Sequence, residues 1–268
     1  MVKASGRSHT IEDMKPPRVS LHSFPDVVLH APEIAVKKHP HYGFAKGGDI
    51  LAADALVADM ANTDCIPRLQ ALLEGRQVEL VSVHALEAEG VNEIPAAFAK
   101  LLSVWLGSPS NESIVQSNTV GHTGASGFQR LANQARFFGQ VMAGRHYLVI
   151  DDFVGQGGTL ANLIGFIESQ GGHVVGATVL TGKPYSAKLA PDAALIQSLR
   201  HKHGQELEEW WRQNFGFGFD ELTRSEARYL ENSSDAHTIR DRLIAARLES
   251  GPANSSGPPA PIDPSDAV

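Results

Sequence analysis

The sequence HYLVIDDFVGQGGTL, residues 146–160, decides the fold. It opens on a continuous apolar run, which is typical of a strand covered on both faces. Apolar residues then recur at helical spacing between Leu160 and Ile167, and Gly171-Gly172 supplies a helix stop. A second apolar run, HVVGATVL, follows at 173–180. A strand, a helix and a strand in this order predict a right-handed parallel crossover unit.

Strand-like and helix-like patterns also alternate on the N-terminal side of this unit. Asp49 is a typical N-cap residue for a helix over 49–60, whose expected buried face holds Ile50, Ala53, Val57 and Met60. Further expected elements are a helix from Pro67 to Gly75, a strand over 78–83, a helix opened by Pro95 and a short strand over 113–117. The fold class is therefore α/β, a parallel sheet flanked by helices.

After residue 185 the pattern becomes helical and charged, which predicts a helical C-terminal extension over 186–250. Trp210, Trp211 and nearby phenylalanines are expected to anchor its helices in a core. The segment 221–249 has five arginines against six acidic residues, a mixed face that argues against nucleic-acid binding. Residues 1–17 and 251–268 are polar or proline-rich, and we expect them to be disordered tails.

Composition narrows the classes of protein that remain. The 268 residues carry a formal net charge of −7, which disfavours nucleic acid or an anionic membrane as the main partner. Hydrophobic residues make up 42% of the chain, enough to bury a core. Cys65 is the one cysteine, so an internal disulfide is excluded, and no apolar run suits a signal peptide or a membrane span. We expect a cytoplasmic protein.

The loop between the predicted central strand and its helix combines two chemistries. Asp151 and Asp152 come at the carboxyl end of a parallel strand, where open α/β sheets place their ligands. Gly155, Gly157 and Gly158 allow backbone N–H groups to approach an anion, and Thr159 opens a helix whose dipole favours phosphate. A ligand that suits both parts has a phosphate at one end and hydroxyls or a cation at the other. A sugar phosphate fits.

This segment resembles the phosphoribosyl-pyrophosphate (PRPP) signature of type I phosphoribosyltransferases, in which a hydrophobic strand precedes two acids and a phosphate loop. The residues that match are Leu148, Val149, Ile150, Asp151, Asp152, Gly157, Gly158 and Thr159. The resemblance implies a type I phosphoribosyltransferase-like fold in which Asp151 and Asp152 bind the ribose hydroxyls as catalytic and Mg²⁺-associated groups. The 5′-phosphate is then held by Gly155, Gln156, Gly157, Gly158 and Thr159. The family usually has threonines where this chain has Gly155 and Gln156, a change that keeps the backbone donors.

The flanking chain extends the resemblance over residues 78–185 and implies the remaining parts of an enzyme. A core over 76–185 is joined to an N-terminal hood or helical segment over 18–75, and residues 118–140 correspond to a flexible loop over the substrate. By the same likeness Arg130 and Arg136 neutralise pyrophosphate, and Lys183 contacts the acceptor. The resemblance also implies Mg²⁺ as cofactor, PRPP as small-molecule substrate and a homodimer.

The expected pyrophosphate loop within 84–94 contains Glu87, Ala88, Glu89 and Gly90, and the stretch HALEAEG has no lysine or arginine. Two carboxylates beside pyrophosphate repel it unless a cation intervenes. The acids could point outward, they could hold metal ions, or the ligand could be something other than PRPP.

Three functions stay open on the sequence. The first is a phosphoribosyltransferase, a pentosyltransferase of nucleotide metabolism with an unidentified nitrogen acceptor. The second is a non-catalytic PRPP- or nucleotide-sensing protein that keeps the ribose-phosphate site. The third is an S-adenosylmethionine-dependent methyltransferase, because IDDFVGQGG also resembles the glycine loop of nucleic-acid methyltransferases. The strand over 173–180 ends without the acid that such enzymes use for the cofactor ribose, which disfavours the third reading.

Overall fold

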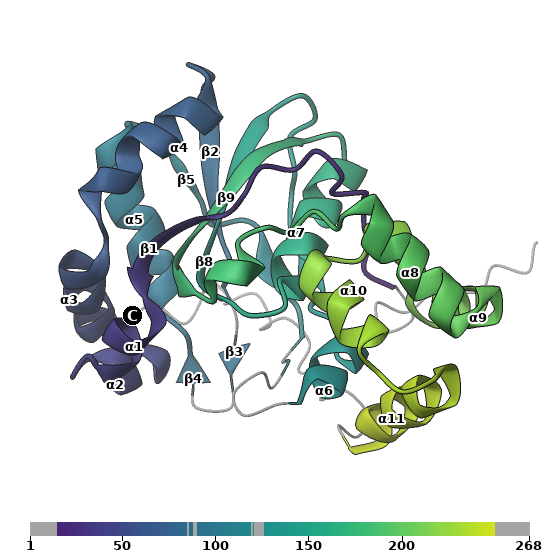
Figure 1. Cartoon of the computed structure of the whole chain (residues 1–268). Helices are drawn as coiled ribbons and strands as arrows, with labels where there is room; N and C mark the ends of the chain where they lie inside the picture. Colours follow the sequence, from purple (N-terminus) through teal and green to yellow (C-terminus); the bar gives the residue numbers. More distant parts are fainter. Residues whose placement is uncertain (1–14, 85, 88–89, 119, 121–125, 250–268) are drawn as a thin grey trace, which may run out of the picture.

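A computed structural model describes residues 15–84, 86–87, 90–118, 120 and 126–249 (Figure 1). Its centre is a five-stranded sheet in the order β1-β9-β8-β2-β5, and every pair of neighbouring strands is parallel. The strands are β1 (Val28–Pro32), β9 (His173–Gly182), β8 (His146–Val154), β2 (Val78–Ser82) and β5 (Ser110–Asn111). The predicted α/β class with a parallel sheet is confirmed.

The crossover predicted from the opening sequence is the middle of this sheet. Strand β8 leads through α7 (Gly158–Ser169) to β9. The two strands pair along their whole length, from His146 opposite His173 to Val154 opposite Gly182. Alternate residues of β8 face opposite layers, since Leu148 and Ile150 belong to one hydrophobic cluster and Tyr147 and Val149 to another. Burial on both faces explains the continuous apolar run.

Helices cover both faces of the sheet. One face carries α1 (Glu33–Lys38), α2 (Tyr42–Lys46), α3 (Ile50–Met60), α4 (Ile66–Leu73) and α5 (Ile94–Leu106), and the other carries α7 (Figure 1). The predicted cap of α3 is confirmed, because the Asp49 carboxylate accepts from the Ala52 N–H at 3.0 Å. The predicted buried face of α3 is wrong in part: Leu56 is buried instead of Ile50, which is 59% exposed.

The edges of the sheet differ from the sequence prediction. The predicted N-terminal segment 18–75 supplies the edge strand β1 in addition to its helices. The strand predicted over 113–117 is correct only for β6 (Val115–Gln116), which pairs antiparallel with β7 (Phe137–Phe138) outside the main sheet. The opposite edge is β5, a pair of polar residues that hydrophobic patterning does not single out.

The C-terminal helices form a third hydrophobic cluster beside the sheet. They are α8 (Ala193–His203), α9 (Gln205–Phe215), α10 (Arg224–Glu231) and α11 (Ala236–Glu249), and α6 (Gly127–Ala132) packs against them. Trp211 is fully buried and stacks on Phe215 with 4.2 Å between ring centroids. The predicted aromatic anchoring of this region is confirmed. Within the part of the chain that is described, no helix combines the length and apolarity needed to cross a bilayer.

A buried ion pair joins the two ends of the described chain. The guanidinium of Arg18 donates to both carboxylate oxygens of Glu226 at 2.8 and 3.0 Å, and the two side chains are 0% and 2% exposed. The Arg18 guanidinium also lies 4.6 Å from the ring centroid of Phe217. This pair fixes the N-terminal segment against the C-terminal helices.

Removing one partner of this pair should destabilise the fold more than removing both. We expect Glu226→Ala to lower the free energy of unfolding by about 3–5 kcal/mol, because it leaves a buried guanidinium without its counter-charge. Arg18→Met combined with Glu226→Met should cost less, since no buried charge then remains. Urea unfolding followed by circular dichroism measures both variants. Equal losses in the single and the double variant would contradict this account.

Candidate functional site

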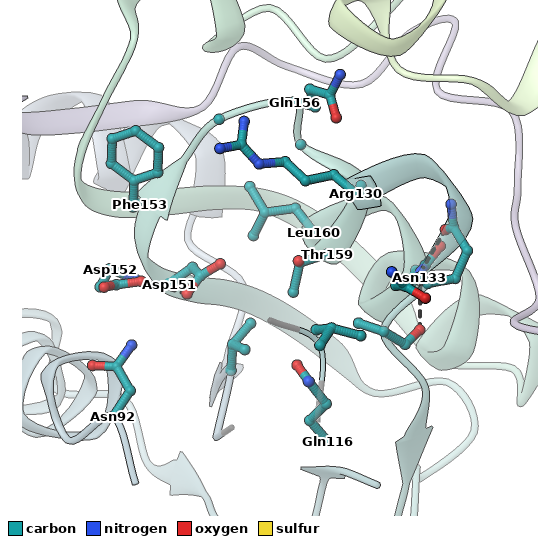
Figure 2. Close-up of a pocket in the computed structure, with 18 of the residues that line it drawn as sticks. Asn92, Gln116, Arg130, Asn133, Asp151, Asp152, Phe153, Gln156, Thr159 and Leu160 are labelled. Carbon is teal, nitrogen blue, oxygen red and sulfur yellow. Dashed lines mark hydrogen bonds between the residues drawn. The ribbon is translucent and has the colours of Figure 1, made fainter. Parts of the chain in front are cut away.

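A cavity of about 340 Å³ lies at the carboxyl end of β8 and the N-terminus of α7 (Figure 2). It is lined by Asp151 and Asp152 from the strand and by residues 155–159 from the connection to the helix. The same cavity also reaches α2, through Tyr42 and Lys46, and α10, through Glu226. This is the edge of a parallel sheet where ligands are expected.

The acidic pair is buried at the wall of the cavity. Asp151 and Asp152 are 6% and 8% exposed, and the N–H of Asp152 donates to Oδ1 of Asp151 at 2.8 Å. Burial, and then the neighbouring charge of Asp152, raises the pKa of Asp151 well above its ordinary value. A group that favours the ionised form of Asp151, such as hydroxyl donors or a cation, would relieve this penalty.

A lysine that the sequence analysis did not single out faces the pair. Lys46, the last residue of α2, donates from Nζ to Oδ2 of Asp152 at 3.2 Å, and both side chains are nearly buried. Lys37 on α1 lines the same side, with Nζ at 4.8 Å from the ring centroid of Phe153. No local pattern marks these lysines, because they reach the site only when α1 and α2 pack beside the end of β8.

The glycine loop has the shape that close approach to an anion requires. Gly157 has a φ of 81°, and a Cβ on it would lie 2.6 Å from Cδ2 of Leu189, so only glycine fits there. It is also the N-cap residue of α7, whose first amides have no partners within the helix. The expected anion-binding turn and helix start thus meet in the cavity.

Of the predicted basic residues, the structure brings Arg130 to the cavity. Its side chain, from α6, extends between Gln156 and Leu160 in Figure 2, and Nη1 lies 4.0 Å from the Cβ position of Gly155. Arg136 and Lys183 are not among the lining residues. Arg136 lies near Arg247, whose pKa is lowered by burial and then by the charge of Arg136. The ammonium of Lys183 is 5.9 Å from the Tyr185 ring centroid.

The expected pyrophosphate loop is described only in part. Two short antiparallel strands, β3 (Leu86–Glu87) and β4 (Gly90–Val91), form its stem. Ala88 and Glu89 lie outside the described residues, as does the side chain of Glu87. Beyond the stem, Asn92 is buried and lines the cavity.

Within the described residues, no group of three or more His, Cys, Asp or Glu side chains is arranged to hold a metal ion. Asp151 and Asp152 supply two carboxylates at the cavity wall, and Asn92 lines the same cavity, whereas the Glu226 carboxylate is already paired with Arg18. Mg²⁺ commonly binds through one or two carboxylates, with water and substrate phosphates completing its octahedron. The residues present therefore fit an ion that arrives with a phosphorylated ligand.

The fold and the site define an α/β protein whose glycine loop and buried acidic pair line one cavity. No family model matches the chain. It is 38% identical over 226 residues to Protein TraN of Escherichia coli, a match that covers 84% of this chain and 50% of TraN. It is 39% identical over 144 residues to an uncharacterized protein of Haemophilus influenzae, with 54% and 32% covered. The chain thus spans half of TraN and about a third of the second relative.

Solved structures to which the chain is similar include adenine phosphoribosyltransferases. The enzyme from Thermoanaerobacter pseudethanolicus has 17% identity and a TM-score of 0.32, with 51% of this chain and 74% of that chain covered. The enzyme from Leishmania donovani has 15% identity and a TM-score of 0.30, with 56% and 57% covered. The names of the two curated relatives state no activity, so the chemistry of the site has to follow from its own geometry.

The buried Asp151 should make stability fall as pH rises. Because its pKa is raised in the folded state, folding favours the protonated form, and ionisation above about pH 4 destabilises the fold. Asp151→Asn keeps the oxygen that accepts from Asp152 and cannot ionise. We expect this variant to exceed the wild type in unfolding free energy at pH 8, with the difference narrowing towards pH 4.

Urea unfolding over pH 4–8 measures this difference, and Asp64→Asn at an exposed position is the matched control. A variant that is less stable than the wild type by the same amount at every pH would show that the Asp151 carboxylate is not penalised in the fold.

Proposed function

We propose that this chain is a phosphoribosyltransferase that binds PRPP with Mg²⁺ and transfers the phosphoribosyl group to a nitrogen acceptor. One observation carries the proposal: the acidic pair at the end of β8 and the glycine loop that opens α7 line the same cavity. A ligand that fills both parts carries hydroxyls and a terminal phosphate on one small sugar. PRPP is such a ligand, and it also brings a diphosphate leaving group.

The 5′-phosphate would lie in the turn formed by residues 155–159. Backbone N–H groups at the start of α7 and the positive end of its dipole favour a dianion there. Arg130 would add a positive charge on the cavity side of the turn. Because these donors are mostly backbone groups, the loss of the family's usual threonines at Gly155 and Gln156 leaves phosphate binding intact.

The ribose hydroxyls would donate to Asp151 and Asp152. Both carboxylates are buried, so their hydrogen bonds form away from bulk water and hold the sugar in one orientation. Lys46 donates to Asp152 and fixes it in place, while hydroxyl donors would offset the burial that raises the pKa of Asp151. The protein thereby orients the anomeric carbon for attack.

Mg²⁺ would be held by Asp151 and Asp152 together with oxygens of the ligand, and it would supply neutralisation of the leaving diphosphate. In the transfer, the bond from the anomeric carbon to the diphosphate oxygen breaks and a bond from the acceptor nitrogen forms. The diphosphate leaves with the bonding electron pair, and the proton that the nitrogen loses passes to the diphosphate or to water. The positive charge that builds up on the ribose lies near the buried carboxylates, which stabilise it electrostatically. The chain's own contribution is positioning and exclusion of water.

A non-catalytic sensor of PRPP or nucleotides is the second candidate. The placement of two residues favours this candidate. Arg136 was expected to contact pyrophosphate and Lys183 the acceptor, and neither is among the residues that line the cavity. Such a protein would keep the ribose-phosphate site and bind PRPP without releasing pyrophosphate. Both candidates bind PRPP, so a binding experiment tests them together. The release of pyrophosphate separates the enzyme from the sensor.

The acidic pair should be required for PRPP binding. We expect Asp151→Asn combined with Asp152→Asn to abolish the binding of PRPP with Mg²⁺ in isothermal titration calorimetry, because the ribose hydroxyls lose both carboxylate acceptors. Asp64→Asn, at an exposed position that does not line the cavity, should bind as the wild type does. Unchanged affinity in the double variant would remove the proposal.

A panel of nucleobases assayed for pyrophosphate release then distinguishes enzyme from sensor. Release with one acceptor, lost in the double variant, identifies a transferase, whereas PRPP binding without release over the whole panel identifies a sensor. Thermal stabilisation by S-adenosylmethionine and none by PRPP would instead identify the methyltransferase reading.

A further inference from the structure

The C-terminal helices reach the glycine loop directly. Thr223, the N-cap residue of α10, donates from Oγ1 to the backbone carbonyl of Gln156 at 2.6 Å, although the two residues are 67 positions apart. Thr223 is fully buried. The same hydroxyl accepts from the N–H of Glu226 at 3.1 Å, so one side chain both caps α10 and holds the loop.

A second contact holds the next turn of the loop from the same side. The buried guanidinium of Arg18 lies 3.5 Å from the carbonyl oxygen of Gly158 through Nη2, and it also donates to the amide oxygen of Asn162 on α7. Glu226 fixes that guanidinium through both carboxylate oxygens. Residues from the start of the described chain and from α10 therefore meet behind the first turn of α7.

These contacts determine which way the loop's donors point. A trans peptide is planar, so the carbonyl of one residue and the N–H of the next point in opposite directions. A Gln156 carbonyl bound to Thr223 turns the N–H of Gly157 away from α10. The Arg18 contact holds the Gly158 carbonyl, at the start of α7, from the side of the ion pair. The N–H of Gly157 therefore points to the side of the loop that lies opposite α10.

The packing leaves no room for the loop to move towards its anchors. A Cβ on Gly158 would lie 2.7 Å from Oε1 of Glu226, and one on Gly157 would lie 3.4 Å from Cγ2 of Thr223. The Arg18–Glu226 pair carries no net charge, so it supports the loop without opposing the anion.

We propose that Thr223 is a positioning residue of the anion-binding loop, assisted by Arg18 and Glu226, and that the C-terminal helices are thereby part of the ligand site. The identity of the anion as a sugar phosphate rests on the function proposed above. The positioning of the loop does not, because it follows from contacts present without ligand.

The test compares Thr223→Val, which keeps the side-chain volume and removes the hydroxyl, with Thr223→Ser, which restores it. We expect Thr223→Val to raise the Kd for ribose 5-phosphate about tenfold, the effect of one lost hydrogen bond, and Thr223→Ser to stay within about twofold of wild type. The Kd for pyrophosphate with Mg²⁺, which does not use the loop, should stay the same in both variants.

A matched control separates loop positioning from loss of a helix cap. Asp235 caps α11 by accepting from the N–H of Thr238 at 2.8 Å, far from the loop in sequence. Asp235→Ala should lower stability as Thr223→Val does and leave the Kd for ribose 5-phosphate unchanged. Equal weakening by both variants would overturn the proposal, because it would then reflect general destabilisation.

A ligand-free measurement separates this proposal from the proposed function. In the full chain, ¹⁵N order parameters of Gly157 and Gly158 should fall from about 0.85 to below about 0.6 in Thr223→Val and return in Thr223→Ser. Unchanged order parameters would overturn the positioning proposal even if PRPP binds. Failure of wild type to bind ribose 5-phosphate or PRPP would overturn the proposed function alone. If Thr223→Val does not fold, Arg18→Lys replaces it, because a lysine cannot reach Glu226 and the Gly158 carbonyl together. This variant should raise the Kd for ribose 5-phosphate and leave that for pyrophosphate unchanged. An unchanged Kd for ribose 5-phosphate would count against the proposal.

Discussion

The structure depends on the burial of β8 between two parallel neighbours. Its edges are hydrogen-bonded to β9 and β2, and helices cover both of its faces, so apolar side chains are required along most of its length. Polar groups can gather only where the strand leaves the sheet. Asp151 and Asp152 lie at that point, and the chain turns directly from them into the glycine loop. The constraint that builds the core thus also places the site.

Burial at this point has an electrostatic cost that shapes the chemistry. Two adjacent carboxylates with almost no exposure cannot both ionise freely, and the pKa of Asp151 is raised as a result. Lys46 donates to Asp152, and its charge also lowers the pKa of Asp151, but by less than burial and Asp152 raise it. A ligand that brings hydroxyl donors or a cation would offset this cost. Sites that sacrifice stability in this way are commonly functional.

The two ends of the described chain complete the site from behind. Arg18 and Glu226 form a buried pair against the first turn of α7, and Thr223 holds the loop by its Gln156 carbonyl. The helical extension is thus in direct contact with the loop that would bind phosphate, rather than an appendage on the far side of the sheet. Ligand binding and the packing of α10 are expected to be coupled through these contacts.

Sequence alone determined the β8–α7–β9 crossover, the acidic pair and the glycine loop, because hydrophobic periodicity and turn chemistry are local and these residues are contiguous. It also marked Arg130 as a residue of the site, but it did not show that Arg136 and Lys183 lie outside the lining of the cavity. Tertiary structure alone decided that β1 and β5 form the sheet edges. It also decided that Lys46 reaches the acidic pair and that Thr223 reaches the glycine loop. Such contacts join residues more than sixty positions apart. They arise from how helices pack around the sheet, and no short stretch of sequence carries that information.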